Sequence, residues 1–172
     1  MEEIKIWESI DQWLSSEIVK MYKNEVAVKQ SLTEWVRKSS HPKLKTLLQH
    51  YFDIIKHHVN SLETQIDKEQ ELKAVKKSNG VMEAIIKECN KNIEACTDYS
   101  LADVCLISGI QTINHYKIST YGTLATIAEM LGKNKMALII RDLEGNEKKT
   151  DLQLTEMATH GINQAAIIGI GR

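Results

Sequence analysis

Proline, cysteine and long apolar runs are scarce in this 172-residue sequence, and each scarcity excludes a class of protein. The three cysteines have no CxxC spacing, which argues against a zinc knuckle and a disulfide framework, so we expect reduced, half-buried thiols. No apolar run approaches the roughly 20 residues that a membrane span needs. With one proline and little alternation of apolar and polar residues, the chain is predicted to be all-α.

An excess of one charge is also missing, because the formal net charge is −1 and no basic cluster is present. A nucleic-acid partner is therefore not expected. The N-terminal stretch MEEIKIWESIDQW mixes charged with apolar residues, unlike a signal peptide, so we expect a cytoplasmic protein with no membrane partner. The length indicates one domain, which we place at residues 1–165, followed by an apolar tail at residues 166–172.

Apolar residues recur at three- and four-residue steps over four long segments, which predicts four amphipathic helices. We expect them at about residues 3–38, 42–69, 100–131 and 135–160, with a shorter helix at about 81–96. The fourth long helix is expected to begin at Asp98 or Ser100, with Asp103 completing a capping box. Gly132 is predicted to end that helix in a left-handed conformation.

Short breaks between these segments predict two antiparallel helix hairpins. Pro42 suits the first turn of the second helix, Asn134 is expected to cap the last long helix, and Gly161 is expected to end it. Four such helices bury their apolar stripes together as a four-helix bundle, here with one longer connection that contains the short helix.

Polar residues interrupt all four apolar stripes near mid-helix. In two antiparallel hairpins these positions fall at similar heights, so we expect one internal polar layer. Isolated buried charges cost several kcal/mol each, so the layer must be paired or must bind a metal. The expected members of the layer are Glu25, His58, Asn114, Lys117, Glu147 and Asp151.

A two-metal centre in such a bundle needs a Glu from two helices and a Glu-x-x-His from each of the other two, and this set is incomplete here. The residue one turn before His58 is Ile54, and the fourth helix offers Asn114 and Lys117. We therefore expect no metal or other cofactor, with the Lys117 ammonium pairing inside with Glu25 or Glu147.

Two alternatives stay open. Lys117 can instead extend outward along its helix toward solvent. A single iron, manganese or zinc ion can be held by Glu25, His58 and Glu147, because three protein ligands and a water suffice for one divalent ion.

Several motifs appear in the order found in one known family. The stretch HYKISTYGTLATIAEMLG at residues 115–132 resembles the signature of the YciE/YciF family of bacterial stress-associated ferritin-like proteins. Further resemblances are Tyr22-x-x-Glu25, Pro42-x-Leu44-Lys45, Met82-Glu83-x-x-Ile86 and Glu147-Lys148-x-Thr150-Asp151-x-x-Leu154-Thr155. The resemblance implies a ferritin-like bundle, often dimeric, with a di-iron-type carboxylate site in typical members.

The departures from the family pattern concern the site. Where the family usually has Glu-His-Tyr-Glu, this chain has Asn114-His115-Tyr116-Lys117. Where the second helix normally brings a Glu one turn before a Gln, it has Ile54 and His58. We therefore expect a non-catalytic bundle with a vestigial metal site, not a di-iron oxidase. Its expected role is structural or interactive, in a stress response, and we expect a homodimer.

Overall fold

The computed structural model describes residues 8–68 and 80–170, and every regular element in these ranges is helical. The helices are α1 (Ile10–Lys38), α2 (Pro42–Lys68), α3 (Gly80–Glu94), α4 (Tyr99–Met130), α5 (Asn134–Met157) and α6 (Asn163–Ile170), with a π-helical turn (Ala158–Ile162) between the last two. The predicted four long helices and the shorter helix between the pairs are confirmed.

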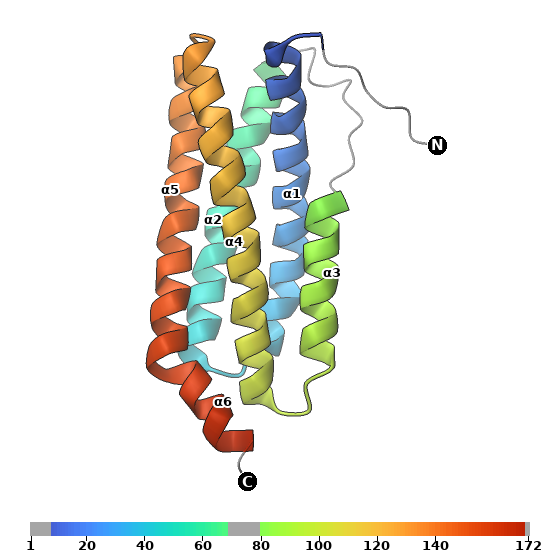
Figure 1. The fold of residues 1–172 in the computed structure, drawn as a ribbon, viewed down its shortest axis with the longest axis vertical. Coiled ribbons are helices and arrows are strands. Elements are labelled where there is room, and N and C mark those ends of the chain that lie inside the picture. The colour runs from blue at the N-terminus through green and yellow to red at the C-terminus, as the bar shows by residue number, and fades with distance from the viewer. Residues whose placement is uncertain (1–7, 69–79, 171–172) are drawn as a thin grey trace, which may run out of the picture.

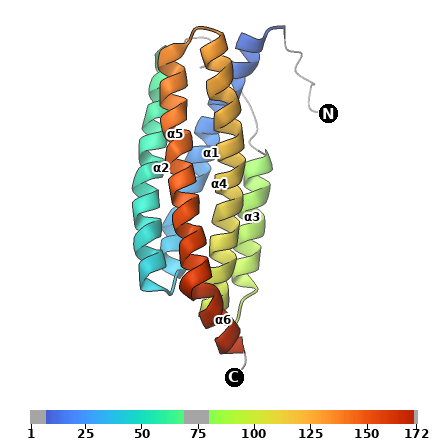
Figure 2. The ribbon, with the colours of Figure 1, turned by 60° about the vertical axis from the view of Figure 1, so that its left-hand side comes forward.

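The four long helices form a bundle of two antiparallel hairpins, α1 with α2 and α4 with α5 (Figures 1 and 2). α3 lies outside this bundle, where it packs against α4 and α1. The all-α class and the four-helix architecture with an extra connecting helix are as predicted. In the described ranges, no helix combines the length and the apolar character that crossing a membrane requires.

Side-chain caps set the first residues of α1 and α4. The side chain of Ser9 accepts a hydrogen bond from the backbone N–H of Gln12, so α1 begins at Ile10 and not near residue 3. Residues 3–7, where the helix was predicted to start, lie outside the described residues. Of the two predicted starts of α4, the structure has Asp98, which caps the helix by accepting from the N–H groups of Ser100 and Leu101.

The capping box predicted for α4 is wrong, because Asp103 serves a different helix. Its carboxylate accepts from the N–H and hydroxyl of Ser40, at 3.0 and 2.6 Å, and from the N–H of His41 at 2.9 Å. These groups immediately precede Pro42, the first residue of α2. Asp103 therefore fixes the start of α2 against the first turns of α4.

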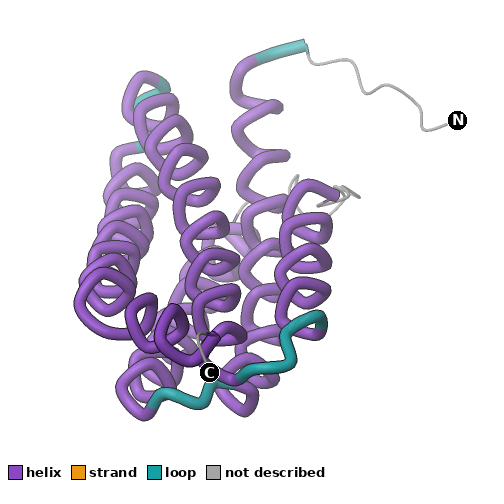
Figure 3. The backbone as a smooth tube through the Cα atoms, turned by 60° about the horizontal axis from the view of Figure 1, so that its bottom comes forward, coloured by secondary structure: helices purple, strands orange, loops and turns teal. Residues whose placement is uncertain are grey.

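Two features at the ends of α5 differ from the prediction. Gly132 has the expected left-handed conformation, with φ of 73°, but Asn134 is the first helical residue and no side chain caps the helix. Gly161 does not end the helix, because the chain continues through the π-helical turn into α6. Figure 3 shows this last helix at the end of the bundle, where it contacts α4. Most of the predicted tail thus belongs to α6.

The apolar core is split into two clusters along the bundle axis. One cluster, called here the α3 cluster, includes Val28, Trp35, Leu48, Ile55, Met82, Ile110 and Leu154. The other, called the α4–α5 turn cluster, includes Leu14, Ile18, Leu62, Leu124, Ala128 and Ile140. The first lies at the level of α3, in the lower half of the bundle in Figure 1, and the second lies toward the α4–α5 turn in the upper half. A layer of polar side chains separates them.

Candidate functional site

Five of the six residues predicted for the polar layer meet at the middle of the bundle. Glu25 comes from α1, His58 from α2, Asn114 and Lys117 from α4, and Glu147 from α5, and each is 0% exposed to solvent. Antiparallel pairing brings these mid-helix positions to one height, as the sequence predicts. The layer is therefore a buried polar centre between the two apolar clusters.

Lys117 occupies the middle of this layer and points inward. Its Nζ lies 2.8 Å from Glu25 Oε2 and 2.6 Å from Glu147 Oε1. The ammonium also donates to the Tyr51 hydroxyl at 3.4 Å. The ammonium thus has two hydrogen-bond acceptors, Glu147 Oε1 and the Tyr51 hydroxyl, and an ion pair with Glu25 Oε2. The outward orientation considered for Lys117 is thereby excluded.

The second oxygen of Glu147 is held by neutral groups. Its Oε2 accepts from the Tyr51 hydroxyl at 2.8 Å and from Asn114 Nδ2 at 2.6 Å. Asn114 Nδ2 also lies 3.1 Å from the Tyr51 oxygen, to which it donates. Tyr51 and Asn114 thus bind one another and the carboxylate, so both oxygens of Glu147 have donors.

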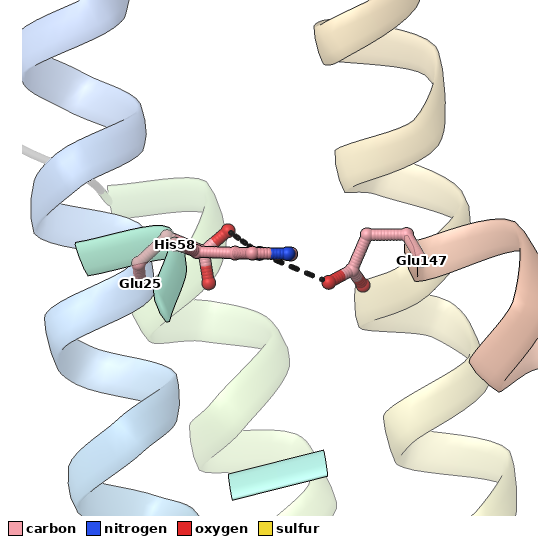
Figure 4. A group of neighbouring side chains, drawn as sticks. All are labelled: Glu25, His58 and Glu147. Atoms are coloured by element: carbon pink, nitrogen blue, oxygen red, sulfur yellow. Dashed lines mark hydrogen bonds and ion pairs between the residues drawn. The ribbon is translucent and has the colours of Figure 1, made fainter. Parts of the chain in front are cut away.

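His58 lies between the two carboxylates, as Figure 4 shows. Its Nδ1 is 3.2 Å from Glu25 Oε1 and 3.5 Å from Glu147 Oε1, so this nitrogen must carry a hydrogen. The Tyr121 hydroxyl also donates to Glu25 Oε1, in a short hydrogen bond. Glu25 Oε2 therefore faces the Lys117 ammonium, and Glu25 Oε1 accepts from His58 and Tyr121.

Burial and pairing act in opposite directions on these acids. Burial alone raises the pKa of Glu25, but the charges of Lys117 and His58 outweigh it and lower this pKa from 4.5 to about 2. Burial, and then the negative charges of Glu147 and Glu25, raise the pKa of Tyr51 well above 10. Burial, and then the negative charge of Glu25, also raise the pKa of Tyr121 well above 10. The carboxylate of Glu25 is therefore ionised and the two phenols are neutral donors.

Among the described residues, three buried polar atoms of the layer make no hydrogen bond: Glu25 Oε2, His58 Nε2 and Asn114 Oδ1. Glu25 Oε2 still has an ion pair with Lys117 Nζ at 2.8 Å, whereas the other two atoms belong to neutral parts of their side chains. The network is thus complete around the charges and incomplete at its neutral edges.

Asp151, the sixth residue predicted for the layer, lies outside it. The inner face of α5 follows Leu143, Glu147, Thr150 and Leu154, all buried, and Asp151 is displaced from this face. Its side chain is 18% exposed and lies 3.3 Å from Nε2 of His115, which is at the surface. Gln111 also donates to Asp151, at 3.2 Å. Asp151 thus joins α5 to the outer side of α4.

The hydroxyl groups of Tyr51 and Tyr121 complete the layer, and sequence reasoning gave them no role in it. Both are fully buried. The available signal was spacing, because Tyr51 precedes His58 by two helical turns and Tyr121 follows Lys117 by one. A phenol at such a position can reach a mid-helix carboxylate on a neighbouring helix.

The donor set was tested against the metal centre that the family resemblance implies. Oxygen and nitrogen atoms of Glu25, His58 and Glu147 all lie within 4.8 Å of one another, which is compatible with one divalent ion. At the α4 positions where the family pattern has two carboxylates, this chain has an amide and an ammonium. These residues do not fit a two-metal centre, since Lys117 approaches both remaining carboxylates.

Comparison with known proteins identifies the family. Residues 9–167 match the family model described as a domain of unknown function, DUF892. Protein YciF of Escherichia coli (strain K12) is 31% identical over 145 residues, which cover 84% of this chain and 87% of that protein.

Solved structures give the same relationship. The crystal structure of the Escherichia coli stress protein YciF superimposes with a TM-score of 0.85 and 29% identity, covering 91% of this chain and 99% of that one. YcfI of Rhodopseudomonas palustris shares the fold, with a TM-score of 0.78 and 20% identity over 90% of this chain and 96% of that one. The chain therefore belongs to the DUF892 family and to the YciE/YciF family.

Proposed function

We propose that this protein is a non-catalytic ferritin-like bundle in which Lys117 replaces the metal of an inherited site. The observation that carries the proposal is the position of Lys117 Nζ, 2.6 Å from Glu147 and 2.8 Å from Glu25. A metal ion between these carboxylates would neutralise them, and the ammonium supplies positive charge at the same place. The layer then has a structural role and binds no substrate.

The proposed biological role is structural or interactive, in a stress response. It is supported by family membership, since the relative YciF is named a stress protein. It is also supported by burial, because the charged residues of the layer are 0% exposed among the described residues. A role carried by the outer surface of the bundle fits a buried centre of this kind.

Elemental analysis of untagged protein tests the replacement of the metal. We expect the wild type to carry far less than one equivalent of iron, manganese or zinc. The double variant Asn114→Glu with Lys117→Glu should gain metal, because it restores carboxylates at the two α4 positions where this chain differs from the family pattern. Lys148→Glu, at the surface of α5, serves as the matched control and should gain none. Stoichiometric metal in the wild type would overturn the proposal.

A single-ion site is the second candidate, favoured by the mutual approach of Glu25, His58 and Glu147 within 4.8 Å. It requires the ion to displace Lys117 from both carboxylates. An ion that binds only the native state raises the melting temperature. Added iron, manganese or zinc should then raise the melting temperature of the wild type and not that of Glu147→Gln. No shift in the wild type would reject this candidate.

A homodimer stays a prediction. Its structural support is a set of large apolar side chains that are mostly exposed, among them Tyr99 (77%), Met130 (82%), Leu138 (72%) and Ile167 (73%). Sedimentation equilibrium should give twice the chain mass at micromolar concentration. A monomer mass at every concentration would contradict the prediction.

A further inference from the structure

The three cysteines gather where α3 meets α4, away from the polar layer. Cys89 lies in the last half of α3, Cys96 in the connection that follows it, and Cys105 in the second turn of α4. All three are free thiols in the structure. Their environments differ, because Cys89 is buried while Cys96 and Cys105 are each partly exposed.

Cys96 and Cys105 are in direct contact. Their Sγ atoms are 3.6 Å apart, and a disulfide needs about 2.05 Å, so the sulfur atoms must approach by roughly 1.5 Å. Cys96 lies outside regular helix, between the end of α3 at Glu94 and the start of α4 at Tyr99. The Cys96 N–H bonds to the carbonyl of Ile93 at 3.2 Å and its thiol donates to that of Asn92 at 3.1 Å, so the approach must break or lengthen the thiol bond. Residues 97 and 98, which follow, are not helical and can supply the backbone movement.

We propose that Cys96 and Cys105 form a redox-sensitive pair that a hydroperoxide converts to a disulfide, which ties the end of α3 to α4. Neither thiol belongs to the polar layer, so this site is independent of the role of Lys117. Both thiols are accessible enough to react, and they are preorganised beside one another, which raises the effective concentration of the second thiol.

The chemistry balances in two steps. The Cys96 thiolate attacks the O–O bond of the hydroperoxide, which gives a sulfenic acid and releases water or an alcohol. The Cys105 thiol then attacks the sulfenic sulfur, the S–S bond forms, and a water molecule leaves. Overall, the two thiols lose two electrons and two protons, and the hydroperoxide is reduced. A dithiol reductant reverses the reaction through thiol–disulfide exchange.

Cys89 provides a natural internal comparison. It is 3% exposed, and burial, followed by the neighbouring Cys105, raises the pKa of its thiol to about 12. It packs so closely on Gly109 that a Cβ added there would lie 2.2 Å from the Cys89 sulfur. Cys89 is therefore a packed thiol that should resist oxidation while the pair reacts.

The reactivity of the pair should depend on pH. Burial, and then the hydrogen bond with Cys105, raise the pKa of Cys96. The thiolate, which is the reacting form, is consequently a minor species at neutral pH and increases as the pH rises. We expect a pair that responds to sustained exposure to hydroperoxide and that reacts faster in alkaline solution.

Tryptic mapping of the full-length protein tests the proposal directly. Cleavage after Lys91 and Lys117 leaves Cys96 and Cys105 on one peptide, residues 92–117, and places Cys89 on the peptide of residues 88–91. Reduced protein is treated with hydrogen peroxide, unfolded, alkylated and digested. Peptide 92–117 should be two hydrogen atoms lighter and unalkylated, whereas the Cys89 peptide should be alkylated. A dithiol reductant should restore two alkylation sites.

Matched variants and a kinetic control separate this pair from general oxidation. Cys89→Ser should form the link at the wild-type rate within twofold, and Cys105→Ser should accumulate sulfenic acid on Cys96 that dimedone labels. Once the sulfenic acid has formed, the ratio of link to unlinked oxidised Cys96 should be at least tenfold higher in native protein than in protein unfolded by guanidinium, because preorganisation acts on the second step. Equal ratios in the two states, alkylation of all three cysteines after peroxide, or a link to Cys89 would each overturn the proposal.

Discussion

Helix α5 carries two glutamates one turn apart that hold their cations at the same distance in different surroundings. Glu147 lies 2.6 Å from Lys117, and both side chains are 0% exposed. Glu144 lies 2.6 Å from Lys148, whose side chain is 59% exposed, and 3.2 Å from Arg141, which is 40% exposed. The separation is the same and both glutamates are buried, since the Glu144 side chain is 9% exposed, so the two clusters differ in the solvent exposure of their cations.

Solvent decides how much each cluster matters for folding. An ion pair near water gains little, because water and salt screen it and long side chains lose entropy. A buried pair is stronger, but its charges have lost their hydration, so each needs every partner that it has. Removing one member of the inner cluster, Glu147 with Lys117, should therefore lower the free energy of unfolding strongly. Removing one member of the outer cluster, Glu144 with Lys148 and Arg141, should lower it little.

Removing the central cation should have the largest effect. Lys117→Met leaves two buried carboxylates without their shared cation, and loss of one partner of a buried pair costs about 3–5 kcal/mol. Urea denaturation at neutral pH measures this change in the free energy of unfolding. Lys148→Met is the matched control on the surface. A loss below about 1 kcal/mol for Lys117→Met would show that the two clusters are energetically alike.

Acid should weaken the inner cluster by a comparable amount. The pKa of Glu25 is about 2 in the folded protein and 4.5 without the fold, so the folded state binds this proton less readily. The stability from Glu25 is full above pH 4.5 and is lost as the pH falls toward 2, by about 3 kcal/mol.

Other carboxylates also titrate in this range, so the variant Glu25→Gln isolates the effect. The difference in unfolding free energy between wild type and variant should shrink as the pH falls from 5 to 2. A difference that stays constant over this range would mean that Glu25 is not held ionised by Lys117 and His58.

Deleting one neutral donor should have a smaller effect. Tyr121→Phe removes the hydroxyl that donates to Glu25, and a hydrogen bond to a charged group contributes about 1.5–3 kcal/mol. Tyr22→Phe is the matched control, because the Tyr22 hydroxyl donates to Glu63 at an exposed position. Thermal unfolding of both variants tests the expectation, which equal losses would contradict.

The smallest effect is expected in the outer cluster. Lys148→Ala should change the free energy of unfolding by less than about 1 kcal/mol, because Lys148 is 59% exposed and its partner Glu144 keeps Arg141 at 3.2 Å. The loss should also shrink further at high salt. A salt-independent loss of several kcal/mol would place this surface pair in the same energetic class as the buried one.

Periodicity predicted the parts of the site that depend on helix geometry. The apolar steps give the number and approximate length of the helices, and the antiparallel hairpins then bring Glu25, His58, Asn114, Lys117 and Glu147 to one height. The family motifs sharpened the choice of Glu25 and Glu147. The architecture and these five members of the layer were therefore accessible from the sequence, but the Tyr51 and Tyr121 hydroxyls were not.

Features that depend on side-chain direction or on distant contacts were not accessible. Periodicity placed Lys117 on the inner face, but its long side chain could still have turned toward solvent. Asp151 follows Glu147 by four residues, yet its carboxylate turns to His115 on α4. Asp103 caps α2 and not its own helix, because the chain folds Ser40 and His41 against it.

The position of the polar layer also fixes how the helices are aligned along their axes. If the core were apolar throughout, one helix could shift along its neighbours by one turn and still bury a similar apolar surface. A slide of one turn, about 5.4 Å, would move Glu147 out of reach of Lys117, Tyr51 and Asn114 together. Every such misaligned bundle would bury unpaired charges. The polar layer therefore selects a single axial register of the helices.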